Sequence, residues 1–218
     1  MSTLTHRRSP VRWAALLIAL LGTLPHTGCD ERPAQVRACF NNFFDACNDR
    51  RGSDAAALLC KDNYDYYMKV RDLALTANKQ ELMARPLVER VEALLARVLV
   101  DHKTLRTLDG RGVFAAVTSA GGNEFPGQIR LTKIKMGRES ATGRCVIDGG
   151  DAGLGYTFSL EEDQWKIDFQ SPDKKIAGQL KDIARKERMT EEELTLAFLS
   201  ESVDEQLLGP EIWKPPGK

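Results

Sequence analysis

The chain has 218 residues, and its 31 lysines and arginines are balanced by 31 aspartates and glutamates, so the formal net charge at neutral pH is zero. Without a basic surplus to neutralise phosphates, the composition argues against a nucleic-acid-binding protein. Hydrophobic residues make up 42% of the chain and charged residues 28%, which is typical of an ordinary globular domain with a core of its own.

Residues 1–28 have the plan of a secretory signal. A basic start with three arginines is followed by an apolar run over residues 13–25, and no acidic residue occurs before Asp30. The segment ends His26-Thr27-Gly28-Cys29, and this ending resembles a bacterial lipoprotein signal, in which the cysteine is acylated and becomes the new N-terminus. The resemblance implies lipidation at Cys29 and attachment to a membrane of the cell envelope.

The same leader allows other interpretations. An ordinary cleaved signal would leave Cys29 as a further cysteine able to form a disulfide. A membrane-spanning anchor is disfavoured, because the apolar run is shorter than the ~20 residues that a helix needs to cross a bilayer. Asp30 directly after the cysteine favours inner-membrane retention in enteric lipoproteins, but which membrane applies here stays open. Residues 29–32 then form the anchor and a short linker.

Four cysteines follow Cys29, and an even number in an exported chain predicts two disulfides. Cys39 and Cys47 lie on one expected helix about 12 Å apart along its axis, too far to pair. We expect Cys47–Cys60 and Cys39–Cys145, because Cys47 and Cys60 flank a turn almost symmetrically. The remaining pairing, Cys39–Cys60 with Cys47–Cys145, stays open. No C-x-x-C pair is present, so neither zinc nor any other cofactor is expected.

The residues after the linker show the apolar period of helices. The pattern predicts a helix over residues 33–48 with one apolar face, and then a second helix with Ser53 or Asp54 as N-cap. Residues 63–78 are apolar nearly all round and predict a buried helix. Pro86 is suited to the first turn of a further helix. The apolar stripe of that helix consists of Leu87, Val91, Leu94, Leu95 and Val98.

After residue 100 the apolar period changes from helical to alternating. Alternation predicts a strand over residues 113–117, followed by a turn at 121–123. A second strand over residues 129–136 changes phase midway, which requires a β-bulge near Thr132-Lys133. A short strand at 144–147 then leads into a glycine-rich stretch, Asp148–Gly155, which is expected to be a loop.

The clearest β-hairpin covers residues 156–169, with its turn at 162–164. Helices followed by a bent antiparallel sheet predict an α+β domain over residues 33–171. The element order, the opening-helix segment Phe40–Asn48 and the closing-strand segment Asp163–Phe169 together resemble the cystatin-like cone of the nuclear-transport-factor-two superfamily. The resemblance implies a pocket between sheet and helices, which serves isomerases, dehydratases and hydrolases in some members and only binding or assembly in others.

Residues 172–218 are expected to form a helical extension that ends in a mobile tail. Thr190 and Glu193 have the spacing of a capping box at the start of a helix, and Gly209-Pro210 is expected to end that helix. The tail from Trp213 onward is predicted to be extended and mobile. Trp213 itself would either anchor a partner or pack back on its own domain.

Five side chains are candidates for acid–base chemistry in a cone: Tyr64, Asp65, Tyr66, Tyr67 and His102. Tyrosines close together on a buried helix are most often core aromatics. Asp65 is expected to face solvent, and His102 is expected at the surface or at a helix C-cap. The sequence therefore assigns no catalytic residue.

The sequence favours a lipid-anchored, non-enzymatic binding or assembly module of the cell envelope. Its partners would be the membrane through the lipid anchor and a small apolar ligand or another envelope protein. The alternative is a small-molecule enzyme that uses a pocket in the cone. The two differ in whether a carboxyl, imidazole or tyrosine hydroxyl faces an enclosed pocket with a shifted pKa.

Overall fold

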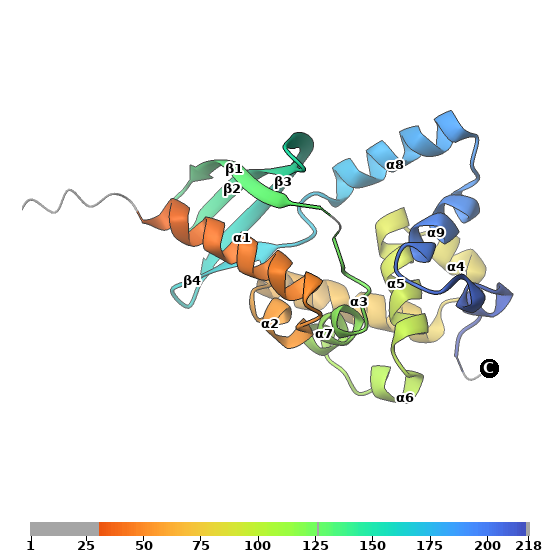
Figure 1. Cartoon of the computed structure of the whole chain (residues 1–218). Coiled ribbons are helices and arrows are strands. Elements are labelled where there is room, and N and C mark those ends of the chain that lie inside the picture. The colour runs from red at the N-terminus through yellow and green to blue at the C-terminus, as the bar shows by residue number, and fades with distance from the viewer. Residues whose placement is uncertain (1–30, 126, 217–218) are drawn as a thin grey trace, which may run out of the picture. The chain divides into compact units, whose positions relative to one another are not determined.

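A computed structural model gives the structure of this protein and describes residues 31–125 and 127–216 (Figure 1). The leader and Cys29 lie outside the described residues, so lipidation there stays a prediction. Arg32–Lys218 form one compact unit. Within the described part of the chain, no helix is both long and apolar enough to cross a membrane.

The described residues contain nine α-helices and a four-stranded antiparallel sheet, which confirms the predicted α+β class. Before the sheet come α1 (Arg32–Asn48), α2 (Gly52–Ala57), α3 (Lys61–Thr76), α4 (Lys79–Met83), α5 (Leu87–Leu99), α6 (His102–Leu105) and α7 (Gly110–Ser119). The strands are β1 (Ile129–Met136), β2 (Ser140–Ile147), β3 (Gly150–Glu161) and β4 (Gln164–Asp168). After them come α8 (Asp173–Glu187), α9 (Glu191–Ser200) and the 3₁₀ turns η1 (Glu205–Leu207) and η2 (Pro210–Trp213).

α1 confirms the first predicted helix and carries its apolar face into the core beside the sheet (Figure 1). Phe40, Phe43 and Phe44 are all buried. The ring of Tyr156 on β3 lies 5.5 Å from the Phe40 ring and 5.6 Å from the Phe44 ring, between centroids. Burying one such side chain contributes about 1.5–3 kcal/mol, so this aromatic cluster holds α1 on the sheet.

The sheet runs in the order β1-β2-β3-β4, with each strand antiparallel to the next. The predicted bulge is confirmed, because the β1–β2 register shifts between Thr132 and Lys135 and Lys133 has a φ of 49°. The predicted hairpin is confirmed too, with Phe158 opposite Ile167. Both features follow from the rule that one face of each strand must stay buried.

Residues 113–117 belong to α7, so the prediction of a strand there is wrong. The Asp109 side chain accepts a hydrogen bond from the Gly112 amide and so caps the start of the helix. Val113 and Val117 are both buried. Their spacing of four fits one helix face as well as one strand face, so alternation over so short a stretch cannot separate the two structures.

Two glycines allow α7 to pack closely against its neighbours. A Cβ atom at Gly110 would lie 1.8 Å from the carbonyl oxygen of Tyr64 in α3. A Cβ atom at Gly52 in α2 would lie 1.9 Å from the carbonyl oxygen of Ala115. Neither distance is sterically possible, so these helix contacts require glycine at both positions.

The start of α2 differs from its prediction. Neither Ser53 nor Asp54 is the N-cap, because the helix already begins at Gly52 with Arg51 in the capping position. No side chain caps the helix by a hydrogen bond. Instead, Asp54 places a negative charge in the first turn, where the helix dipole favours it. Its Oδ2 accepts a hydrogen bond of 2.7 Å from Arg51 Nη1.

The Asp148–Gly155 segment is mostly strand rather than loop. Only Asp148 and Gly149 form the connection, with φ angles of 49° and 83°. Two consecutive residues with positive φ make the tight turn that best suits the twist of a hairpin. β3 therefore begins at Gly150, earlier than the glycine content indicated.

The C-terminal region confirms the Thr190–Glu193 capping box, since both of its reciprocal hydrogen bonds are present. α9 ends at Ser200, however, before the predicted stop at Gly209-Pro210. Trp213 lies in η2 and is buried, with Lys79 Nζ 5.2 Å from its ring centroid. Trp213 thus packs on its own domain, and the prediction of an extended tail starting there is wrong.

Two arginines of α5 fasten the C-terminal region to the rest of the domain. Arg97 donates to the carbonyl oxygen of Ala74 in α3 at 2.7 Å and to that of Ile212 in η2 at 2.8 Å. Arg90 is only 1% exposed, and its Nη2 donates to Glu191 Oε2 at 2.7 Å. These charged contacts cross from the middle of the chain to its end, so residues 172–216 are an integral part of the domain.

Candidate functional site

The four described cysteines are all buried and carry free thiols, so neither predicted disulfide is present in the structure. Burial raises the pKa of Cys39 and Cys47 to about 12, and that of Cys60 and Cys145 to about 11, so all four thiols keep their protons at neutral pH. A buried protonated thiol packs as a small apolar side chain, which explains why an even number of cysteines need not mean pairing. Among the described residues no group of acidic, histidine or cysteine side chains could hold a metal ion.

Three of the five acid–base candidates lie away from any enclosed site. Asp65 is exposed, as predicted. His102 is the first residue of α6, just after the capping residue Asp101, so it is not at a helix C-cap. The Tyr64 hydroxyl donates to the carbonyl oxygen of Ala56 at 3.3 Å. The Tyr64 contact ties α3 to α2, and none of the three side chains lines the cavity described below.

The other two candidates meet a carboxyl that is not among the five. The Tyr67 hydroxyl donates to Glu92 Oε1 at 2.9 Å. The Tyr66 hydroxyl and Glu92 Oε2 are both buried, and neither has a hydrogen-bond partner within normal geometry. Burial, and then the nearby Glu92 charge, raise the pKa of both tyrosines, so both stay protonated.

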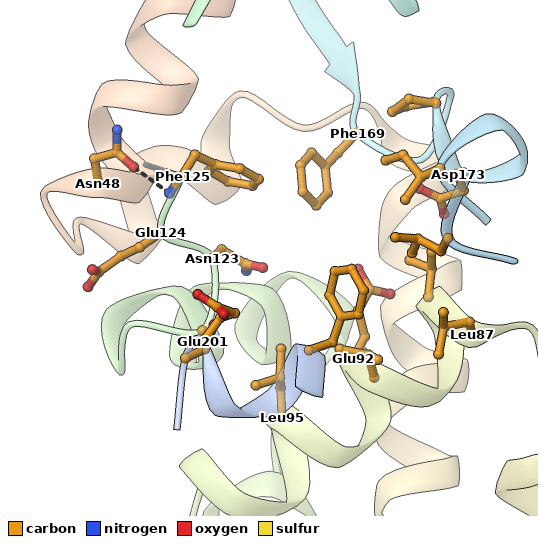
Figure 2. A pocket seen from close by; sticks show the side chains of 18 of the residues that line it. Asn48, Leu87, Glu92, Leu95, Asn123, Glu124, Phe125, Phe169, Asp173 and Glu201 are labelled. Atoms are coloured by element: carbon orange, nitrogen blue, oxygen red, sulfur yellow. Dashed lines mark hydrogen bonds between the residues drawn. The ribbon is translucent and has the colours of Figure 1, made fainter. Parts of the chain in front are cut away.

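Glu92 also lines a cavity of about 620 Å³ (Figure 2). Its walls come from α5, the start of α8, the end of α9 and the segment between α7 and β1. The lining residues are Asn48, Leu87, Val88, Val91, Glu92, Leu95, Gly122, Asn123, Glu124, Phe125, Tyr156, Phe169, Pro172, Asp173, Ile176, Leu180, Phe198, Glu201 and Ser202. A cavity of this size is within the range of small-molecule sites.

The walls of the cavity are largely apolar. α5 contributes aliphatic side chains such as Leu95, and α8 contributes Ile176 and Leu180. The rings of Phe125 and Phe169 lie along one side of the space in Figure 2, with centroids 5.9 Å apart. Such a lining favours the apolar part of a ligand through the hydrophobic effect.

The charged side chains that the structure describes along the cavity are all acidic: Glu92, Glu124, Asp173 and Glu201. Glu92 and Asp173 lie on the right of the view in Figure 2, and Glu124 and Glu201 lie on the left. Glu124 forms an ion pair with Arg50, which is itself not part of the lining. Among the side chains that the structure describes, no basic one lines the cavity.

Two of these carboxyls have strongly shifted pKa values. Burial raises the pKa of Glu92 to about 7, and polar contact with the two tyrosine hydroxyls offsets part of the rise. Burial, and then the charges of Glu92 and Asp168, raise the pKa of Asp173 to about 8. Near neutral pH these carboxyls therefore exchange protons readily and respond to any charge placed between them.

Neither carboxyl is among the candidates predicted from the sequence, although one of them carries a local signal. Glu92 occupies the same helix face as Val88 and Leu95, so it interrupts an apolar row with a carboxylate. Asp173 follows Pro172 at the start of a helix, where an acidic residue is ordinary. Its burial depends on how α8 packs near α5, and no local pattern reports that contact.

Comparison of the chain with protein-family models, with curated proteins and with solved structures found no match in any of the three.

Proposed function

We propose that this protein is an exported, lipid-anchored binding module of the cell envelope that holds a ligand with an apolar body in the cavity beside α5 and α8. The observation that supports the proposal is the cavity of about 620 Å³ with its largely aliphatic and aromatic walls. An open apolar space of this size is costly to leave exposed to water, and ligand sites are the common reason for one. The resemblance to the cystatin-like cone is consistent with a pocket of this kind.

A fluorescent dye tests the binding proposal. N-phenyl-1-naphthylamine is uncharged and brightens in apolar surroundings, so the full chain carrying Cys29→Ala, kept free of detergent, should enhance its fluorescence saturably. Ile176→Trp fills the cavity from α8 and should weaken dye binding about tenfold or more. Ile183→Trp is the matched control, because Ile183 is on the same helix, is 49% exposed and is not part of the lining. Equal binding by the two variants would contradict the proposal.

The anchoring part of the proposal is supported by the order of the leader: a basic start, an apolar run and Gly28-Cys29. Cys29→Ala should move the protein from the membrane fraction to the soluble fraction, because acylation of that thiol is the expected attachment. The measurement is immunoblotting of fractions after a high-salt wash, with Cys39→Ala as the control cysteine variant. Retention of Cys29→Ala in washed membranes, with its leader shown by mass to be removed, would rule out this anchor, because an uncleaved apolar leader would itself hold the chain there.

A second candidate function is acid–base catalysis on a small molecule. It is favoured by the Tyr67–Glu92 hydrogen bond of 2.9 Å and by a Glu92 pKa of about 7, since a carboxyl of that pKa is suited to proton transfer near neutral pH. The test is exchange of the protons beside the carbonyl of 2-decanone in heavy water, followed by NMR. Exchange faster with the protein than with Glu92→Gln would support catalysis, and equal rates would exclude it for this probe.

A further inference from the structure

We infer that the ligand of this cavity carries a positive charge: it is an amphiphile with an apolar body and an amine or quaternary ammonium group that lies between Glu92 and Asp173. The inference rests on the proposed function and specifies the ligand class. It is carried by the charge of the lining, which holds four carboxyls and, among the side chains that the structure describes, no basic group.

Glu92 and Asp173 are placed differently from the other two carboxyls. Glu124 is compensated by Arg50 outside the lining, and Glu201 is exposed to solvent. The side chain of Asp173 makes no hydrogen bond or ion pair with any group that the structure describes, although it is only partly exposed. Glu92 is less isolated: Tyr67 donates to its Oε1 at 2.9 Å, and polar contact with the Tyr66 hydroxyl also lowers its pKa. Asp173 is therefore the partly buried carboxyl of the lining that no described donor or cation satisfies, and such a carboxyl without a partner beside a cavity indicates a missing donor or cation.

The surroundings of the pair contain further acidic groups rather than compensating charges. Glu92 is faced by Tyr66 and Tyr67 from α3 and by Glu89 on its own helix. Asp173 is faced by Glu92 and Asp168, and both shift its pKa in the same direction. A ligand cation between the carboxyls would reverse this effect and favour their ionised forms.

The same charges discriminate between amphiphiles. A fatty acid or an alkyl sulfate would bring a negative charge next to two carboxyls and so disfavour their ionised forms further. A neutral alcohol would bury its chain but gain no ion pair. An alkylammonium gains both, and the nearby aromatic rings can also contact its charged group.

Three probes with the same chain test the inference: decyltrimethylammonium, 1-decanol and decanoate, each competing with N-phenyl-1-naphthylamine below its micelle concentration. The full chain carrying Cys29→Ala should bind the cation about tenfold more tightly than the alcohol, and decanoate most weakly. Decyltrimethylammonium keeps its charge at every pH. Its affinity should therefore fall between about pH 9 and about pH 5 as the carboxyls take up protons, whereas that of the alcohol should not.

Glu92→Gln combined with Asp173→Asn should remove the preference for the cation, with each probe's affinity taken relative to that variant's own affinity for the dye. Asp182→Asn is the matched control, since Asp182 is an exposed carboxyl of α8 outside the lining. Dye binding by the protein with both carboxyls intact, but without a preference for the cation, would overturn the inference and leave the proposed function standing. Failure of every probe to bind would instead overturn the proposed function. If the double variant does not fold, the pH series on the unsubstituted carboxyls decides the question.

Discussion

Glu92 shows what one buried carboxyl does to the stability of the domain. Its native pKa of about 7 lies above the ordinary value of 4.5, and burial is the main cause. In the native state the group therefore holds its proton at pH values where the unfolded chain has already lost it. The contribution of Glu92 to the free energy of unfolding is accordingly greatest in acid and falls as the pH rises through the native pKa.

Glu92→Gln should remove this loss, because glutamine keeps an acceptor for the Tyr67 hydroxyl but never ionises. We expect the variant to gain stability relative to the wild type between about pH 4 and about pH 8, by at most about 3 kcal/mol. Urea denaturation at the two pH values measures the difference. Asp182→Asn controls for the general loss of one negative charge, and a pH-independent difference for Glu92→Gln would contradict the expectation.

At the scale of elements, α8 forms one wall of the cavity and ends in an unfavourable residue. Arg188, its C-cap, has φ 56° and ψ 33°, the left-handed conformation that a residue with a Cβ adopts at a cost. Glycine adopts that conformation freely and is the commonest residue at this place in helices. The strain is local to the end of the helix, and Arg188 is not part of the cavity lining.

Arg188→Gly should therefore raise the free energy of unfolding by about 0.5–1 kcal/mol. Arg185→Gly is the matched control, because Arg185 is exposed within the same helix, where glycine should lower the stability by about 1 kcal/mol. Thermal denaturation followed by circular dichroism at 222 nm compares both variants with the wild type. Destabilisation by both substitutions would show that the left-handed conformation carries no cost here.

The elements that could be predicted are those in which the apolar pattern and the turn residues indicate the same structure. The hairpin over residues 156–169 alternates on both sides of a polar turn, and the phase change near Lys133 can be satisfied only by a bulge. The helix α7 could not be predicted, because Val113 and Val117 fit a helix and a strand equally well. The cavity could not be predicted for another reason: Asp173 becomes buried only through the packing of distant elements, which local sequence does not describe.

For the whole molecule, the cysteines offer a direct comparison between the sequence prediction and the structure. The even number after Cys29 predicts two disulfides, whereas the structure contains four buried free thiols. Their pKa values of about 11 to 12 make the thiolate scarce at neutral pH, so alkylation should be slow in the native protein and fast after unfolding.

We expect mass spectrometry after iodoacetamide treatment to show four alkylated sites among residues 30–218 when the protein is unfolded without reductant. The same treatment of the native protein should leave these sites largely unmodified. A reductant should not shift the melting temperature, because these four cysteines form no bond for it to break. Four unmodified cysteines after unfolding would instead show that all four are paired in disulfides.

Trp213 is buried, so its fluorescence can report whether the domain unfolds as one cooperative unit. Of the three tryptophans in the chain, Trp13 belongs to the leader, Trp165 lies in β4, and Trp213 lies in η2. With the leader removed, Trp165→Phe leaves only the indole of Trp213 in the C-terminal region. Trp213→Phe leaves only the indole of Trp165 in the sheet. Coincident unfolding curves from the two variants would identify one cooperative unit, and separate curves would identify a C-terminal region that detaches before the sheet melts.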